Sequence, residues 1–197
     1  MIYFDFHTHL DRKNSCRSCT LEELQNGISL LDNRKISLQF HPWHLKVNYD
    51  GLPEKFVEFA KSDCVYAIGE IGLDRLKGPS LEVQKAYFAD LLKLTDELQK
   101  PVILHVVRCA DDVLHMLAGY PDLIKIWHGF RGRSELFERI VKADIFVSLH
   151  YSMLENAEFI NYIKQHREYL DRIGFESDDR EIEVEKLYRT FEGLINE

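Results

Sequence analysis

The stretch that decides the fold is Ile2-Tyr3-Phe4-Asp5-Phe6-His7-Thr8-His9-Leu10-Asp11, an apolar run that leads into two histidines one residue apart. In an extended backbone, residues i and i+2 point to the same face, so His7 and His9 can direct both imidazoles at one point. Such a pair can begin a metal site. On its own, however, it is more typical of an edge strand with two solvated histidines, so the rest of the chain must supply further ligands.

Composition indicates a globular protein. The chain has 197 residues, of which 45% are hydrophobic and 29% charged, and a chain of this size buries roughly 70% of the surface that its unfolded form exposes. We therefore expect one domain over residues 1–197. No signal peptide and no membrane-spanning run is visible, so we expect a cytoplasmic protein that does not bind a membrane.

Charge and cysteine usage narrow the class further. A net charge of −8 argues against a protein that coats nucleic acid with a broad basic face. It does not exclude binding of a small substrate or of the end of a nucleic-acid strand. The pair Cys16-x-x-Cys19 could bind zinc, but no second Cys-x-x-Cys or histidine pair lies nearby. Ordinary reduced thiols are the better interpretation, because nothing indicates an oxidising compartment.

Apolar runs alternate with helical patterns along the chain. Strands are expected at 2–6, 36–40, 65–70, 102–104, 123–127, 145–149 and 172–175, with a degenerate one at 28–31. Helices are expected at 20–27, 53–62, 81–99, 111–117, 136–142, 155–166 and near the C-terminus. This alternation calls for an α/β fold with parallel strands. We expect a TIM-type (β/α) barrel, abridged, with about seven clear strands and one degenerate or missing.

Metal-ligand residue types follow six of these strands. They are His7, His9, His41, His44, Glu70, His105, His128 and Asp178. In a (β/α) barrel, the carboxyl ends of all strands meet at one mouth, so these side chains should converge. Imidazoles and carboxylates in one place suit one or two divalent cations of the Zn, Mn or Mg type.

Six ordered blocks resemble the TatD family of metal-dependent hydrolases, within the amidohydrolase-like TIM barrels. The blocks are Phe4 to Asp11, His41-Pro42-Trp43-His44, Ala67 to Asp74, Pro101 to His105, His128-Gly129-Phe130-Arg131-Gly132 and Glu176-Ser177-Asp178. The string Gly69-Glu70-Ile71-Gly72-Leu73-Asp74 is the most distinctive of them. Together the blocks run along nearly the whole chain.

The resemblance implies a site with two divalent metal ions, Mg, Mn or Zn. In it, His7, His9, Glu70 and Asp178 hold one metal, and Glu70 bridges to a second metal held by His105 and His128. Glu70 and Asp178 are the implied catalytic residues, since Asp178 could accept a proton from a metal-activated water.

The implied activity is that of a deoxyribonuclease that cleaves phosphodiester bonds in single-stranded or terminal DNA. Two alternatives remain: a hydrolase of small esters, lactones, amides or phosphoesters, and a metal-binding accessory protein with low activity. The protein would be a monomer or a small homo-oligomer.

Substrate contacts are expected from Arg108, His41, His44 and Arg131, because guanidinium groups bind phosphate bidentately. The alternative is that these side chains are only solvent-exposed residues at the rim of the barrel and do not contact a substrate. His115, His150 and His166 are expected to be structural or surface residues. Compared with the family, the chain is short between Asp11 and Ile36 and after Asp178, which predicts a trimmed rim and a more open metal site.

Overall fold

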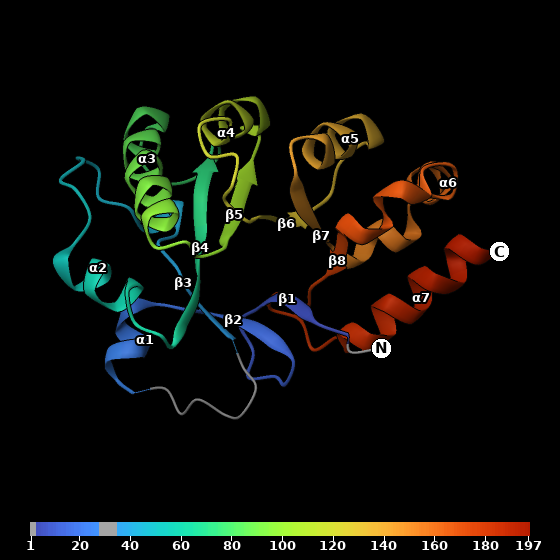
Figure 1. The fold of residues 1–197 in the computed structure, drawn as a ribbon, viewed down its shortest axis with the longest axis horizontal. Coiled ribbons are helices and arrows are strands. Elements are labelled where there is room, and N and C mark those ends of the chain that lie inside the picture. The colour runs from blue at the N-terminus through green and yellow to red at the C-terminus, as the bar shows by residue number, and fades with distance from the viewer. Residues whose placement is uncertain (1–2, 28–34) are drawn as a thin grey trace.

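The computed structural model describes residues 3–27 and 35–197, which form a closed barrel of eight parallel strands in chain order (Figure 1). The strands are β1 Asp5–Thr8, β2 Ser15–Cys19, β3 Lys35–Leu38, β4 Val65–Asp74, β5 Val102–Val107, β6 Lys125–Phe130, β7 Ile145–Leu149 and β8 Ile173–Phe175. The helices are α1 Leu21–Gln25, α2 Glu54–Ala60, α3 Leu81–Glu97, α4 Ala110–Leu117, α5 Ser134–Lys142, α6 Ala157–Gln165 and α7 Val184–Asn196. Short 3-10 turns lie at η1 Pro42–His44, η2 Tyr151–Glu155 and η3 Arg167–Arg172. The predicted TIM-type fold is confirmed.

The second strand corrects the expectation of a degenerate or missing strand. β2 pairs in parallel with β1 and with β3, where Cys16 to Cys19 lie opposite Lys35 to Leu38. Its sequence, Ser-Cys-Arg-Ser-Cys, lacks the branched apolar residues that mark a buried strand, yet four of its five side chains are buried. The expected strand at 28–31 and the start of the first strand at Ile2 lie outside the described residues.

Helix signals in the sequence are reproduced closely. The capping box predicted before the first helix is present: Glu23 N donates to Thr20 Oγ1 and Thr20 N donates to the Glu23 carboxylate, at 3.1 and 2.8 Å. The longest predicted helix is α3, which begins after Ser80 as its N-cap. These local signals hold because capping depends only on neighbours in the chain.

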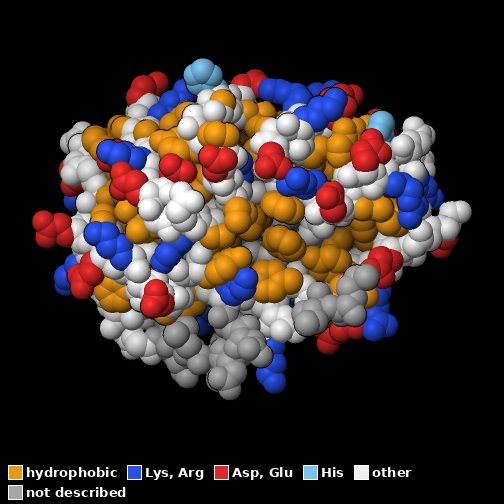
Figure 2. Space-filling model, in the orientation of Figure 1, with side chains coloured by type: hydrophobic (Ala, Val, Ile, Leu, Met, Phe, Trp, Pro, Cys, Tyr) orange, Lys and Arg blue, Asp and Glu red, His pale blue; other side chains and the backbone are white. Residues whose placement is uncertain are grey.

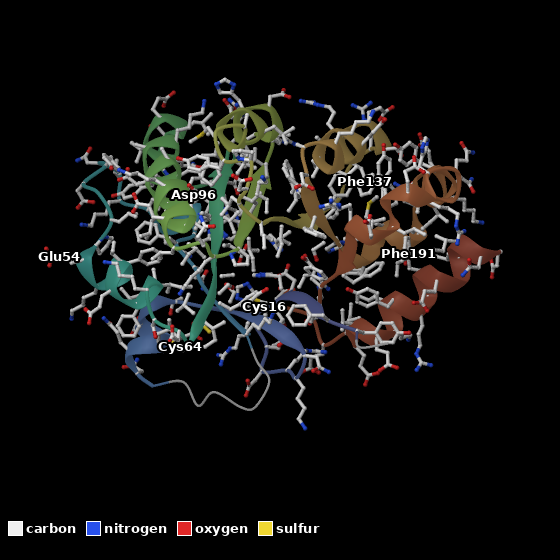
Figure 3. The ribbon with its side chains drawn as sticks, in the orientation of Figure 1. Cys16, Glu54, Cys64, Asp96, Phe137 and Phe191 are labelled. Atoms are coloured by element: carbon white, nitrogen blue, oxygen red, sulfur yellow. The ribbon has the colours of Figure 1, made fainter. Side chains whose placement is uncertain are left out.

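The hydrophobic core has two layers. The larger one lies between the strands and the helices and includes Phe137 of α5 and Phe191 of α7 (Figure 3). The smaller one, around Cys16, Ala67 and Ile103, fills the barrel interior. Each large apolar side chain buried in this way contributes about 1.5–3 kcal/mol to the stability of the fold. The filled interior leaves the strand ends as the place for chemistry.

A close approach of β4 to β5 depends on glycine. Gly72 has a φ of +147°, and a Cβ at this position would lie 2.1 Å from the carbonyl oxygen of His105. Only glycine permits both the backbone conformation and this contact. As a result, β4 and β5 run together over five ladder pairs, between Ile68 and Asp74 on one strand.

The surface carries mixed charges. On the face drawn in Figure 2, hydrophobic side chains gather in the middle and acidic and basic side chains are interspersed around them. Among the described residues, no helix is long and apolar enough to cross a membrane.

Candidate metal centre

Glu70 lies at the centre of the predicted site. It is the sixth residue of the ten-residue strand β4 and only 4% of its surface is exposed. One carboxylate oxygen, Oε1, lies 3.2 Å from His7 Nε2 and 3.3 Å from His9 Nε2. The alternation of β1 therefore directs both histidines at the same oxygen, as the His-x-His spacing predicts.

The other oxygen of Glu70 faces a second group of histidines. Oε2 lies 3.1 Å from His128 Nε2, 3.3 Å from His105 Nδ1 and 3.5 Å from His41 Nε2. His105 and His128 are residues within β5 and β6, since both strands continue beyond them. His41 is thus only 0.2 to 0.4 Å farther from Glu70 than the two histidines for which the resemblance implies a ligand role.

Asp178 completes the group on the side of His7 and His9. Its Oδ1 lies 3.7 Å from the Nε2 atoms of both histidines. Three sets of potential ligand atoms lie within 4.8 Å of one another: His7–His9–Asp178, His7–Glu70–His128 and His41–Glu70–His105. Glu70 belongs to two of them, so one carboxylate joins two neighbouring groups of ligands.

The alignment of His7 shows that these residues fit a cation. His7 is fully buried, yet neither of its ring nitrogens has a hydrogen-bond partner among the described residues. Its Nε2 is near Glu70 without the angle that a hydrogen bond requires. Ligands that surround one ion approach each other in this way, because their lone pairs point at the ion. Buried polar atoms otherwise find a partner in nearly all proteins.

Electrostatics also favour a cation here. Burial alone would raise the pKa of Glu70, but His7, His128 and His105 hold it well below its usual value. Burial likewise opposes a charge on His128, yet the carboxylates of Glu176 and Glu70 raise its pKa well above the ordinary histidine value. Glu70 is therefore an ionised carboxylate, the form that binds a metal.

Two acidic residues that sequence reasoning missed contact the ring nitrogens of His105 and His128 that do not face Glu70. Asp74 Oδ2 lies 3.2 Å from His105 Nε2, and Glu176 Oε1 lies 3.1 Å from His128 Nδ1. A carboxylate behind a ligand histidine fixes the tautomer and the orientation of the ring. Both acids are within the sequence blocks that resemble the TatD family, but only their spatial contacts assign them this role.

The loop after β8 places Asp178 through contacts with β1. Asp178 N donates to His7 O at 3.1 Å, and His9 N donates to Asp178 O at 2.9 Å. Below this pair, Ser177 donates from its backbone N and its Oγ to the two carboxylate oxygens of Asp5, at 3.0 and 2.7 Å. Asp178 itself has a φ of +52°. The segments that follow the first and the last strand of the barrel thus meet at the candidate metal centre.

A cavity of about 490 Å³ opens above these groups, and we call it the mouth cavity. The predicted residues that line it are His9, His41, His44, Glu70, His105, His128, Arg131 and Asp178. His150, expected to be a structural or surface residue, also lines it, as does Trp43, whose indole N–H donates to Asp74 at 2.5 Å. Arg108 is exposed and does not contribute to this lining, so its substrate role stays a prediction.

Comparison with related sequences identifies the family of the chain. Residues 15–181 match the TatD related DNase family. A deoxyribonuclease Tat-D of Schizosaccharomyces pombe is 32% identical over 108 residues, which is 52% of this chain and 35% of that protein. An uncharacterised metal-dependent hydrolase of Methanocaldococcus jannaschii is 28% identical over 170 residues, 75% of this chain and 67% of that protein. The chain therefore spans about a third of the first relative and two thirds of the second.

Solved structures show the same fold. A TatD homologue from Escherichia coli superimposes with a TM-score of 0.73 over 98% of this chain and 89% of the other, at 20% identity. A TatD family hydrolase from Entamoeba histolytica gives 0.64 over 84% and 60%, at 22% identity. With the family match covering most of its length, the chain belongs to the TatD family of metal-dependent hydrolases.

Proposed function

We propose that the protein hydrolyses phosphodiester bonds in DNA with two divalent metal ions, Mg, Mn or Zn. The observation that carries this proposal is the position of Glu70, whose two oxygens face two separate groups of histidines. A carboxylate can bridge two cations because it has two donor oxygens, whereas an imidazole offers one nitrogen at a time. In this proposal His7, His9 and Asp178 bind on one side of Glu70, and His105 and His128 bind on the other.

Each side chain has a task that its position allows. When bound, the two cations would polarise the phosphoryl group and acidify a water molecule. Asp178 faces the mouth cavity with its side chain about one third exposed, so it can accept the proton of that water. Asp74 and Glu176 keep the rings of His105 and His128 aligned through the reaction. His41 either binds beside His105 or contacts the substrate, since it lies next to Glu70 and lines the mouth cavity.

The proposed substrate is a DNA end or a single strand. Arg131 lies at the mouth cavity, where its guanidinium can bind a phosphate. His44 also lines the cavity and can donate a hydrogen bond to the same substrate. The relative from Schizosaccharomyces pombe is a deoxyribonuclease, which supports the same class of substrate. A monomer or a small homo-oligomer would suffice, because one chain supplies every proposed ligand.

A small ester or phosphoester is the second candidate. It is favoured by the size of the mouth cavity, about 490 Å³, which lies within the range of small-molecule sites. The acidic Asp179 at the same cavity would also repel a polyanion. The same metal-activated water could attack a carboxylic ester.

The test is cleavage of end-labelled single-stranded DNA by metal-depleted protein to which Mg, Mn or Zn is returned. We expect metal-dependent shortening of the DNA, and a loss of at least about 100-fold in kcat/KM for Glu70→Gln and for Asp178→Asn. Asp122→Asn, an exposed carboxylate before β6, is the matched control and should act like the parent protein.

Other outcomes identify the alternatives. Hydrolysis of nitrophenyl esters without any shortening of DNA would replace the nuclease by the small-ester hydrolase. Metal binding by calorimetry without turnover of either substrate would indicate the accessory protein.

A further inference from the structure

A second cavity adjoins the mouth cavity, and we call it the arginine cavity. It has a volume of about 870 Å³ and lies between the start of α5 and the 3-10 turn η2 that precedes α6. These two helices lie beside each other at the upper right of Figure 1. Its lining includes Arg131, Arg133, Arg139, Glu135, Ser152 and Asn156.

The lining is positively charged although the whole chain is acidic. Three guanidinium groups stand against the single carboxylate of Glu135, in a chain of net charge −8. Arg139 is already paired with Asp111 at 2.5 Å. Arg131 and Arg133 are both exposed, and neither forms an ion pair within residues 3–27 and 35–197. Two guanidinium groups are therefore available to an anion.

The arginine cavity is continuous with the mouth cavity. Arg131 lines both. In addition, His150 lines the mouth cavity while Ser152 lines the arginine cavity, and His150 Nδ1 lies 2.8 Å from Ser152 Oγ. The same two segments, after β6 and after β7, thus form a wall of each cavity. A ligand longer than one unit can extend from one to the other.

We propose that the arginine cavity binds the backbone phosphate of a nucleotide next to the bond that is cleaved. This inference rests on the proposed phosphodiesterase function and adds the class of substrate, an oligonucleotide rather than a nucleotide ester. Arg133 binds the phosphate bidentately, with Arg131 between this phosphate and the reacting one. Asn156 can donate from Nδ2, because its Oδ1 already accepts from Phe159 N at the start of α6.

Steady-state kinetics test the proposal with Arg133→Gln. The measured quantity is the ratio of kcat/KM for a thymidine hexanucleotide to that for bis(p-nitrophenyl) phosphate, which has a single phosphate. We expect Arg133→Gln to lower this ratio about tenfold, mostly through KM, since one phosphate contact is lost. Arg133→Lys, which keeps the charge without the bidentate geometry, should restore part of it. The control is Arg189→Gln on α7, whose arginine pairs with Glu185. An unchanged ratio in Arg133→Gln would overturn the proposal.

Binding without turnover separates this inference from the proposed function. Fluorescence anisotropy with a labelled hexanucleotide in EDTA measures the dissociation constant when no cleavage takes place. We expect Arg133→Gln to raise it about five- to tenfold and to reduce the slope of log K against log salt by about one. Equal affinity of Arg133→Gln and Arg189→Gln would refute the arginine cavity. Failure of the parent protein to cleave any phosphodiester would refute the function, whatever this result.

Discussion

Neighbouring strands of the barrel are joined in two very different ways around the candidate metal centre. Between β4 and β5, five ladder pairs and a glycine contact hold the strands together. Between β1 and β8, which we call the seam (residues 5–9 and 173–178), there is one ladder pair, Asp5 with Phe175, and one isolated bridge, Thr8 with Asp178. Side chains complete the seam: Ser177 Oγ lies 2.8 Å from Thr8 Oγ1 and donates to Asp5.

The contrast shows that side-chain hydrogen bonds contribute more to holding the seam than to holding β4 against β5. His105 pairs with Gly72 in the backbone ladder between β4 and β5, and Glu70 lies in β4 where the register of that ladder shifts, between Ile68 and Ile71. His7, His9 and Asp178 stand on the seam, where a few buried hydrogen bonds fix their relative positions. We therefore expect damage to β4–β5 to affect folding and damage to the seam to affect metal binding.

The largest effect is expected for Gly72→Ala in β4. The new Cβ would overlap the carbonyl of His105, so we expect a loss of about 3 kcal/mol or more in the free energy of unfolding, or no folded protein. Urea denaturation measures this. The matched control is Gly193→Ala in α7, where nothing lies within 4 Å of the added methyl, and a gain of about 0.5–1 kcal/mol is expected. Equal stability of the two variants would contradict the account of β4–β5.

Metal binding should stabilise the seam more than β4–β5. At a divalent cation concentration about 100 times the dissociation constant, the free energy of unfolding should rise by about 2.7 kcal/mol, which corresponds to about 5–10 °C in Tm. Hydrogen exchange with and without EDTA locates the gain, and we expect slower exchange at residues 5–9 and 175–178. In Glu70→Gln the shift in Tm should largely disappear. A uniform slowing over all strands would argue against the division into two regions.

Ser177→Ala should weaken the seam moderately. The substitution leaves one oxygen of the buried Asp5 without its donor, which should cost about 1–2 kcal/mol. Because Asp178 is the next residue, metal affinity should also fall about tenfold by isothermal titration calorimetry. Ser18→Ala in β2 is the control, since its buried hydroxyl has no hydrogen-bond partner among the described residues. Loss of stability without loss of metal affinity would show that the seam does not position Asp178.

The smallest effect is expected in the rate of thiol labelling, which measures local opening of the structure next to the seam. Burial raises the pKa of Cys16 to about 12 and that of Cys19 to about 11, so both thiols should resist alkylation at pH 8 in the folded protein. Cys64 is only half-buried and should react first. In Ser177→Ala, labelling of Cys16 should accelerate about tenfold for each 1.4 kcal/mol of easier opening. Mass spectrometry of the labelled peptides measures each rate. Rapid labelling of Cys16 in the parent protein would contradict its burial in β2.

The sequence predicts the fold and the placement of the predicted metal ligands because both depend on local patterns. Apolar runs identify seven strands, and Glu70, His105 and His128 can be found from these runs alone. β2 is not predicted because its buried side chains are mostly serine and cysteine, so the sequence shows no apolar run there. The roles of Glu176 and Asp74 are not predicted because their histidine partners are 48 and 31 residues away in the sequence. Only a three-dimensional structure brings such pairs together.

The two tryptophans of the chain occupy opposite environments. Trp127 is 4% exposed in the core, whereas Trp43 is 40% exposed at the mouth cavity, with Lys77 Nζ 3.8 Å from its ring centre. The emission of Trp127 should be blue-shifted and constant, and that of Trp43 should be red-shifted and responsive. A paramagnetic cation such as Mn²⁺ should then quench Trp43 selectively. We therefore expect Trp43 to report occupancy of the candidate metal centre without an attached label.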